Sequence, residues 1–357
     1  MKETDKVTRV DADPGHSVIS TGPTVAAASD QASAPIATVI LLCYKQESTI
    51  RRAIESVLRQ RCRYSYEILV ADDASPDATR RICEEYATRY PETVRMLPPA
   101  PNKGLVDNYF DAVLASRGKY VADCAGDDEW VDPSRLERCI EILEAYKELS
   151  VAFTSTETVC GDRITGGHDS PQEAPGSRIS GAVLLHRVLD HTNSIPYVLS
   201  AALYRRAPVV EALSVTPGIL RCHDGGVEDI PLIAFLGSIG DAMKVDMTGY
   251  RYYIEGESIS NNLSAEKDYW FTARVSSMTC RLGRHYGLPL SAQRRHCREK
   301  FNYMAAKARQ SGSKALITDM LRRRREWGMP LPPKAVIHTL LALAGWHGRL
   351  RKSRSDT

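Results

Sequence analysis

Ala37-Thr-Val-Ile-Leu-Leu-Cys43 is an almost wholly apolar run, and the fold can be worked out from it. Such a run is typical of a strand that is buried on both faces of a parallel sheet. Residues 47–60 follow with apolar side chains at helical spacing, and residues 67–71 repeat the buried-strand pattern. The same alternation predicts further strands and helices at 77–90, 94–97, 105–116, 119–124 and from 132 onward. This order predicts an α/β protein with an open, mostly parallel sheet and helices on both faces.

Polar side chains stand where these strands end. Tyr44 follows the first strand, Asp72 and Asp73 follow the second, and Asp127 and Asp128 follow the fourth. Ligands of open α/β sheets bind beyond the carboxyl ends of the strands. One acidic pair in a loop is commonly a turn feature, but two pairs at one edge would repel each other unless a cation or hydrogen-bond donors lay between them. Mg²⁺ or Mn²⁺, held by one or two carboxylates and substrate phosphates, would relieve that repulsion.

Two other classes of nucleotide-binding protein do not fit. The stretch from Cys43 to Ile50 contains no glycine, whereas dinucleotide-binding enzymes need glycine at that turn for close approach of the pyrophosphate. A Walker A loop is absent as well. The phosphates of a bound nucleotide must therefore be neutralised in another way, which agrees with a metal at the acidic strand ends.

Residues 37–155 resemble the donor-binding half of a family 2 glycosyltransferase with the GT-A fold. The resemblance is carried in order by Val39–Gln46, Tyr66–Ser75, Asn102–Gly104, Arg117–Val121 and Gly126–Pro133. It implies an inverting, non-processive enzyme that moves a sugar from a nucleoside-diphosphate sugar to an acceptor hydroxyl or amine. The metal motif departs from the family pattern Asp-x-Asp, because it reads Ala125-Gly-Asp-Asp128.

The resemblance also implies roles for individual residues. Tyr44 would contact the base, and Asp73 the base or ribose. Asp128 would bind the metal directly, with Asp127 near the ribose or the metal. The other donor-site residues would be Glu47, Asp72, Asn102, Lys103 and Gly104. The donor would be a UDP- or dTDP-sugar, whereas the acceptor (a glycan, lipid-linked sugar, protein or small molecule) stays open.

Inverting transfer also needs a carboxylate that takes the proton of the acceptor hydroxyl. Residues 223–231 are polar, contain glycine and precede an apolar helical run. They resemble the family's late acidic motif, in which an Asp at the start of a helix is the catalytic base. Asp229 fits this role best, and Glu228 is the alternative. Both acids could instead simply favour the positive end of a helix dipole.

The composition suggests three parts. The first 35 residues have no aromatic side chain and no periodicity, and we expect them to be disordered. A GT-A domain would span 36–262, with a donor half at 36–155 and an acceptor and catalytic-base half at 156–262. Residues 263–357 would form a basic helical extension.

The extension carries most of the positive charge. Residues 281–357 contain 18 Lys or Arg and 4 Asp or Glu. The apolar segment 334–346 is too short to span a bilayer, so 334–357 would contact an anionic membrane surface or pack on the catalytic domain or a partner. Few aromatic residues accompany the run Arg322–Arg325, so no nucleic-acid binding is expected.

The cysteines suggest a compartment, and two alternative functions stay open. The nine cysteines form no metal-binding or disulfide framework, which favours a reducing environment. With no signal-like or membrane-spanning segment, a cytoplasmic protein is expected, with peripheral contact at the inner membrane face. The alternatives are a catalytically silent nucleotide-sugar-binding protein and a membrane-surface or polyanion-binding scaffold. The cysteines are Cys43, Cys62, Cys83, Cys124, Cys139, Cys160, Cys222, Cys280 and Cys297.

Overall fold

The computed structural model describes residues 34–167, 174, 176–190, 198–254, 264–328 and 332–345. The expected disordered tail at 1–35 lies outside these residues except for its last two. The boundary expected at 262/263 also lies outside them, so the division into a domain and an extension stays a prediction. No helix within the described ranges is long and apolar enough to cross a membrane.

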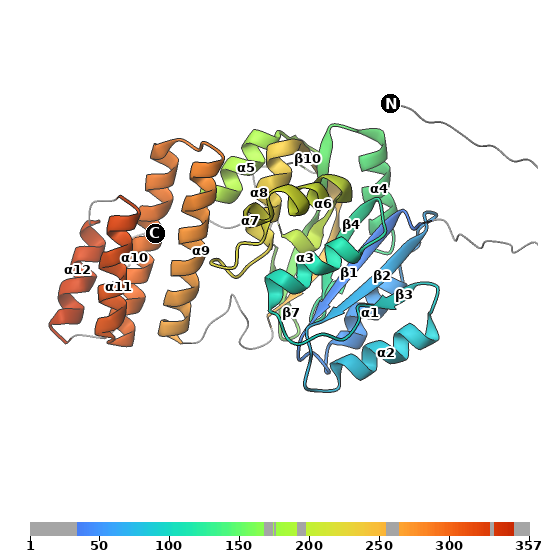
Figure 1. Cartoon of the computed structure of the whole chain (residues 1–357), viewed down its shortest axis with the longest axis horizontal. Helices are drawn as coiled ribbons and strands as arrows, with labels where there is room; N and C mark the ends of the chain where they lie inside the picture. The colour runs from blue at the N-terminus through green and yellow to red at the C-terminus, as the bar shows by residue number, and fades with distance from the viewer. Residues whose placement is uncertain are drawn as a thin grey trace, which may run out of the picture. The chain divides into compact units, whose positions relative to one another are not determined.

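Ten strands of the described chain form one sheet, in the order β3-β2-β1-β4-β9-β6-β10-β5, with β7 beside β6 and β8 beside β10 (Figure 1). The strands are β1 (Ala37–Cys43), β2 (Tyr66–Asp72), β3 (Val94–Met96), β4 (Tyr120–Ala125), β5 (Glu129–Trp130), β6 (Leu149–Cys160), β7 (Arg163–Gly166), β8 (Arg178–Ile179), β9 (Ala202–Arg205) and β10 (Asp241–Tyr253). Strands β1 to β4 are parallel, and β9 runs antiparallel between β4 and β6. In the pairing register, Cys43 lies opposite Asp72, and Leu42 lies opposite Ala125. The loops after β1, β2 and β4 therefore leave the sheet at one edge.

Helices cover both faces of this sheet. They are α1 (Ile50–Leu58), α2 (Thr79–Arg89), α3 (Leu105–Ala115), α4 (Arg135–Ala145), α5 (Gly181–Asp190), α6 (Arg206–Val215), α7 (Pro217–Leu220) and α8 (Asp229–Ile239). Neighbouring residues of β1 point to opposite faces: Val39 and Leu41 pack with α1, α2 and α4, whereas Ile40 packs with α3, α5, α6 and α8. The open, mostly parallel sheet with helices on both faces, predicted from the alternating strands and helices, is confirmed.

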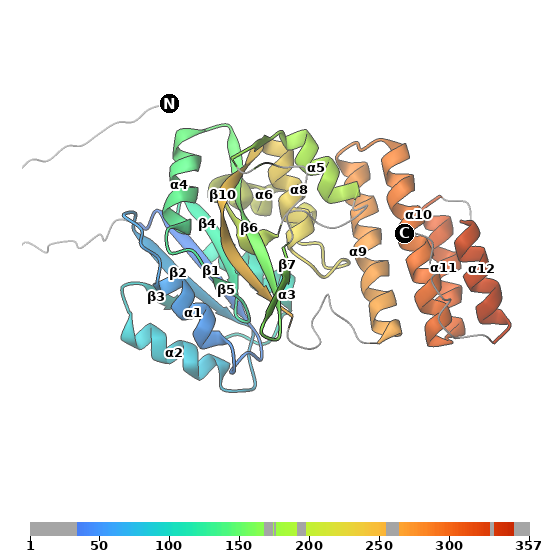
Figure 2. The ribbon, with the colours of Figure 1, turned by 180° about the vertical axis from the view of Figure 1, so that it is seen from behind.

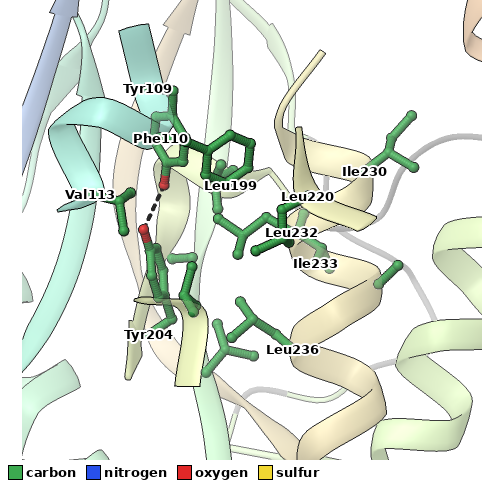
Figure 3. Packing of buried hydrophobic residues seen from close by; sticks show 14 of the residues in the cluster. Tyr109, Phe110, Val113, Leu199, Tyr204, Leu220, Ile230, Leu232, Ile233 and Leu236 are labelled. Carbon is green, nitrogen blue, oxygen red and sulfur yellow. Dashed lines mark hydrogen bonds between the residues drawn. The ribbon is translucent and has the colours of Figure 1, made fainter. Parts of the chain in front are cut away.

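The second face holds a large apolar core. Tyr109 and Phe110 of α3 pack near Leu232 and Leu236 of α8, and the hydroxyl groups of Tyr109 and Tyr204 are hydrogen-bonded at 2.7 Å (Figure 3). This packing fixes α8 against the sheet, and α8 carries the predicted catalytic acids at its first turn.

The chain ends in four described helices: α9 (Ala265–His285), α10 (Leu290–Ser311), α11 (Lys314–Glu326) and α12 (Pro333–Leu343). They share a core of their own around Tyr269, Phe301 and Met320. Helix α9 also places Met278 and Leu282 in the core under α8, and both views of the ribbon show α9 next to α5 (Figures 1 and 2). The expected helical C-terminal region thus packs directly on the α/β part through α9.

Candidate functional site

The loops after β1 and β2 are held together in an unusual backbone conformation. Lys45 and Ala74 both have a φ of 58°, which residues other than glycine rarely adopt. The N–H of Lys45 donates to Ser75 Oγ at 3.1 Å, and Gln46 N–H donates to a threonine hydroxyl of α2 at 2.8 Å. Strained backbone persists only where its surroundings enforce it, and it clusters at functional sites. The ring of Tyr44, 42% exposed, therefore projects from a rigid loop at the edge of the sheet.

Asp72 and Asp73 are adjacent but have different surroundings. Asp72 accepts the N–H of Ser75 and lies 3.6 Å from Arg80, so its carboxylate serves the loop that contains it. The carboxylate of Asp73 instead accepts the backbone N–H groups of Lys103 and Gly104, both at 2.9 Å. Asp73 thus fastens the loop before α3 to the end of β2.

The remaining predicted donor-site residues lie around this contact. The Asn102 side chain donates to the carbonyl oxygen of Asp73 at 2.8 Å. The carboxylate of Glu47 accepts the N–H of Ala78, the N-cap residue of α2, at 2.9 Å. The Lys103 ammonium pairs with Asp111 of α3 at 2.6 Å. The loops that follow β1, β2 and β3 are therefore joined at one edge, and each of these contacts is made within the protein.

The loop after β4 packs closely on α1. A Cβ atom added to Gly126 would lie 2.3 Å from the side-chain oxygen of Gln46 and 2.9 Å from Ile50. The Thr49 hydroxyl donates to the carbonyl oxygen of Gly126 at 2.9 Å, and Arg52 donates to that of Asp127. Glycine at position 126 is therefore what allows Asp127 and Asp128 to lie against the tip of β1.

Asp128 is the more buried of the two acids. Only 2% of its surface is exposed; one carboxylate oxygen accepts the N–H of Tyr253 at 2.9 Å and the other accepts the hydroxyl of Tyr250. Burial, together with repulsion from Asp127, raises the pKa of Asp128 to about 7. The guanidinium of Arg52 acts in the opposite direction and stacks on the Tyr253 ring, 3.6 Å from its centroid.

This acidic pair fits a divalent ion that has few protein ligands. Among the described residues no group of three or more His, Cys, Asp or Glu side chains could hold a metal. Asp127 nevertheless raises the pKa of the adjacent Asp128, and a cation would be stabilised by two carboxylates at such a site. Mg²⁺ commonly uses one or two protein carboxylates and takes its other ligands from phosphates and water.

The predicted catalytic acids come to the same edge by a different route. Strand β10 runs parallel to β6, and β6 runs in the direction of β4 and β1. Gly240 alone separates the end of α8 from the start of β10, so the first turn of α8 lies toward the carboxyl ends of these strands. Glu228 is its N-cap residue and Asp229 its first residue, with an Asp229 oxygen accepting the N–H of Ile230 at 2.6 Å.

These two acids compete for a proton. Burial and the neighbouring Asp229 raise the pKa of Glu228 to about 8, and burial raises the pKa of Asp229. The charge of Asp123 adds to the effect on Glu228. At neutral pH the pair therefore holds one proton more readily than two exposed carboxyl groups would.

Asp123 is a site residue that sequence reasoning missed. It lies within β4, is 3% exposed, and accepts hydrogen bonds from Tyr109 at 3.1 and 3.0 Å. Figure 3 shows the onward bond from Tyr109 to Tyr204. Burial raises the pKa of Asp123 to about 8. The available signal was an acid within an otherwise apolar strand, where a charge is costly unless it is paired or neutralised.

Helix α9 supports the loop that precedes these acids. Met278 of α9 leaves no room for a side chain at Gly225, since an added Cβ would lie 2.2 Å from its sulfur. Arg281 pairs with Asp224 at 2.6 Å, and on the other side His223 approaches Asp107 of α3 at 2.9 Å. The loop at 222–227 is thus clamped between α3 and α9.

Comparison with known proteins agrees with this geometry. Residues 38–209 match the sequence model of the family described as glycosyl transferase family 2. An uncharacterized protein of Mycobacterium tuberculosis is 37% identical over 172 residues, which cover 48% of this chain and 47% of that protein. The chondroitin synthase of Escherichia coli is 25% identical over 252 residues, 70% of this chain and 33% of the synthase. The chain thus spans about half the length of the first of these relatives and a third of the second.

The crystal structure of residues 1–349 of Staphylococcus aureus TarS, in complex with UDP-GlcNAc, is similar in fold. Its TM-score is 0.51 at 15% identity, and the match covers 87% of this chain and 90% of that one. At this identity the similarity concerns the fold, which is the GT-A fold.

Proposed function

We propose that this chain, which belongs to glycosyl transferase family 2, transfers a sugar from a nucleoside-diphosphate sugar to an acceptor hydroxyl or amine with inversion at the anomeric carbon. The observation that carries the proposal is the arrangement at one edge of the sheet. The loops with Tyr44, Asp73 and Asp127 and the first turn of α8 with Asp229 all start there. This edge offers an aromatic face, a polar nucleotide-binding loop, an acidic pair and a base.

The donor nucleotide would lie on the loops after β1 and β2. The exposed ring of Tyr44 supports stacking on a base, and a uridine or deoxythymidine diphosphate is the proposed donor group. Asp73 would order the 102–104 loop and use its remaining lone pairs for the ribose or base. Asn102, Lys103 and Gly104 would then form the wall of the nucleotide site.

A divalent cation, Mg²⁺ or Mn²⁺, would bind at Asp127 and Asp128. When bound, the ion stabilises the negative charge of the leaving diphosphate. Arg52 and Tyr250 keep the pair in place, since Arg52 holds the backbone of Asp127 and Tyr250 the carboxylate of Asp128. Asp127, the more exposed acid, would face the diphosphate.

Asp229 would be the catalytic base, with Glu228 as the neighbouring acid. The pKa of both acids is raised, that of Glu228 to about 8, so the pair shares a proton at neutral pH, and we assign the remaining carboxylate to Asp229. Asp229 then accepts the proton of the acceptor hydroxyl as the new bond forms. A positioned base of this kind contributes about 10²- to 10⁴-fold to the rate.

The experiment compares Asp229→Asn with Glu211→Gln, which changes an exposed acid on α6. Sugar transfer from the preferred donor should fall by about 100-fold or more in Asp229→Asn, with donor affinity unchanged. Glu211→Gln should retain most of the activity. Full turnover by Asp229→Asn would show that Asp229 is not the catalytic base. If Glu228→Gln were instead the inactive variant, the base would be Glu228.

A second proposal concerns the last described helix. Ile337 and Leu340 lie one turn apart on α12 and are 51% and 61% exposed. Arg324 and Arg325 add positive charge on the preceding helix. We propose that this region contacts an anionic membrane surface, with the apolar side chains in the interface and basic groups near the headgroups. Residues 346–357 of the segment expected to do this lie outside the described residues.

A further inference from the structure

A second group of reactive side chains lies between α9 and α10, away from the strand edge. The Sγ atoms of Cys280 on α9 and Cys297 on α10 are 2.6 Å apart. A disulfide bond is about 2.05 Å long, so closing the gap requires a side-chain shift of about half an ångström. The two helices thus hold this pair of thiols in direct contact.

The two thiols differ in acidity. The S–H of Cys280 and the charge of Arg284 lower the pKa of Cys297, whereas Cys297 and burial raise the pKa of Cys280. The thiolate is the nucleophile in disulfide exchange, and a neighbouring thiol can then resolve the mixed disulfide. Cys297 therefore has the surroundings of an attacking thiol and Cys280 those of a resolving one.

Both thiols are accessible from a pocket. Its volume is about 240 Å³, and its lining includes Cys280, Cys297, Arg284, Arg294, Gln293 and Trp327. Neither Arg284 nor Arg294 has a carboxylate partner among the described residues. Cys280 and Cys297 are only 3% and 4% exposed, so a reagent would reach them through this pocket. Glu326 also lines the pocket, but its carboxylate is paired with Arg322, so the two guanidinium groups favour a small anionic reagent.

We propose that Cys280 and Cys297 form a redox-active dithiol that a small anionic disulfide oxidises through this pocket. The Cys297 thiolate attacks one sulfur of the reagent, forms a mixed disulfide and releases one thiolate. Cys280 then attacks Cys297 Sγ, loses its proton to solvent and releases the second thiolate. The products are one protein disulfide between α9 and α10 and two reduced thiols, so the two electrons lost by the protein reduce the reagent.

The test uses the full chain, fully reduced, with glutathione disulfide as the probe at neutral pH. After quenching and alkylation, mass spectrometry should show Cys280 linked to Cys297 in the wild type. Cys280→Ser should stop at a stable glutathione adduct on Cys297, and Cys297→Ser should leave Cys280 free. The exposed Cys160 provides the control, since Cys160→Ser should form the same link at the same rate.

Arg284→Gln probes the electrostatic part. If the loss of its charge raises the thiol pKa by about one unit, the attack should slow by about threefold at neutral pH, since the smaller thiolate fraction is partly offset by greater nucleophilicity. The proposal is overturned if both thiols stay free while Cys160 reacts, or if Cys280→Ser carries no adduct on Cys297. A wild-type protein that retains glutathione on Cys297 without forming the link would refute the resolving role of Cys280. None of these outcomes depends on sugar transfer.

Discussion

The hydroxyl group of Tyr250 donates a hydrogen bond to the carboxylate of Asp128, across 122 positions of sequence. Both residues are almost fully buried, at 0% and 2% exposure. The contact ties β10, next to the helix that carries the proposed base, to the loop that carries the proposed metal ligands. Two parts of the proposed reaction, leaving-group stabilisation and proton removal, are thereby placed on one rigid sheet.

The buried carboxyl of Asp128 predicts a pH-dependent stability. Its pKa is about 7 in the folded protein, against 3.8 for an exposed aspartate. Between these two pH values the folded state thus binds more protons than the unfolded state. The stabilisation that the protonated carboxyl group gives the folded state is therefore full below about pH 4 and is lost as the pH rises through 7. The free energy of unfolding in urea should fall over this pH range by about 1.4 kcal/mol for each unit by which the pKa of Asp128 is higher in the folded than in the unfolded state.

Asp128→Asn tests that origin. The variant should show a shallower loss of unfolding free energy between pH 4 and 7.5, although Asp123 and Glu228 retain their own contributions. Mn²⁺ should stabilise the wild type more at pH 7.5 than at pH 5, because it competes with the proton. An identical slope in both proteins would show that Asp128 does not carry this effect.

Gly126→Ala should damage both stability and donor binding. The added Cβ would collide with Gln46 and Ile50, and the loop would move away from β1. Steric insertions of this kind cost about 1–3 kcal/mol. Gly218→Ala is the matched control, since nothing lies within 4 Å of its added Cβ and its φ is not positive. Thermal unfolding and nucleotide titration should separate the two variants; equal behaviour would mean that the loop tolerates displacement.

Binding to anionic vesicles tests the proposed membrane contact. Deletion of 334–357 should abolish salt-sensitive sedimentation with the vesicles. Ile337→Ser with Leu340→Ser should weaken the binding by about a hundredfold or more, since each buried aliphatic side chain is worth about 1.5–3 kcal/mol. Neutral vesicles provide the control for charge. Unchanged binding by the truncated protein would locate the contact elsewhere or remove it.

The sequence predicts the donor half of the fold well, because each buried strand carries its own apolar run. β1 and β2 follow from Val39 and Ile68 and their neighbours. The common edge of Tyr44, Asp73 and Asp127 then follows from the rule that parallel strands end together. The difference in burial between Asp127 and Asp128 could not be predicted. It depends on Tyr250, which lies 122 positions further along the chain, in β10.

Two other features were beyond sequence reasoning for the same reason. The carboxyl group of Asp123 accepts a hydrogen bond from Tyr109 of α3. The sequence pattern predicts this helix but does not place it against β4. The thiol pair of Cys280 and Cys297 depends on how α9 and α10 pack, and their spacing matches no motif. Long-range contacts of this kind determine pKa values and reactivity, whereas local patterns determine the elements.

The acidic edge of the sheet is proposed to bind a nucleotide-sugar together with a divalent cation. Calorimetric titration of UDP- and dTDP-sugars, with and without Mn²⁺ or Mg²⁺, measures this in the wild type, in Asp128→Ala and in the exposed-site control Asp162→Ala. The account predicts metal-dependent binding of one donor, retained by Asp162→Ala and weakened by Asp128→Ala in a protein that remains folded. No binding of any donor to folded wild-type protein with metal present would contradict it.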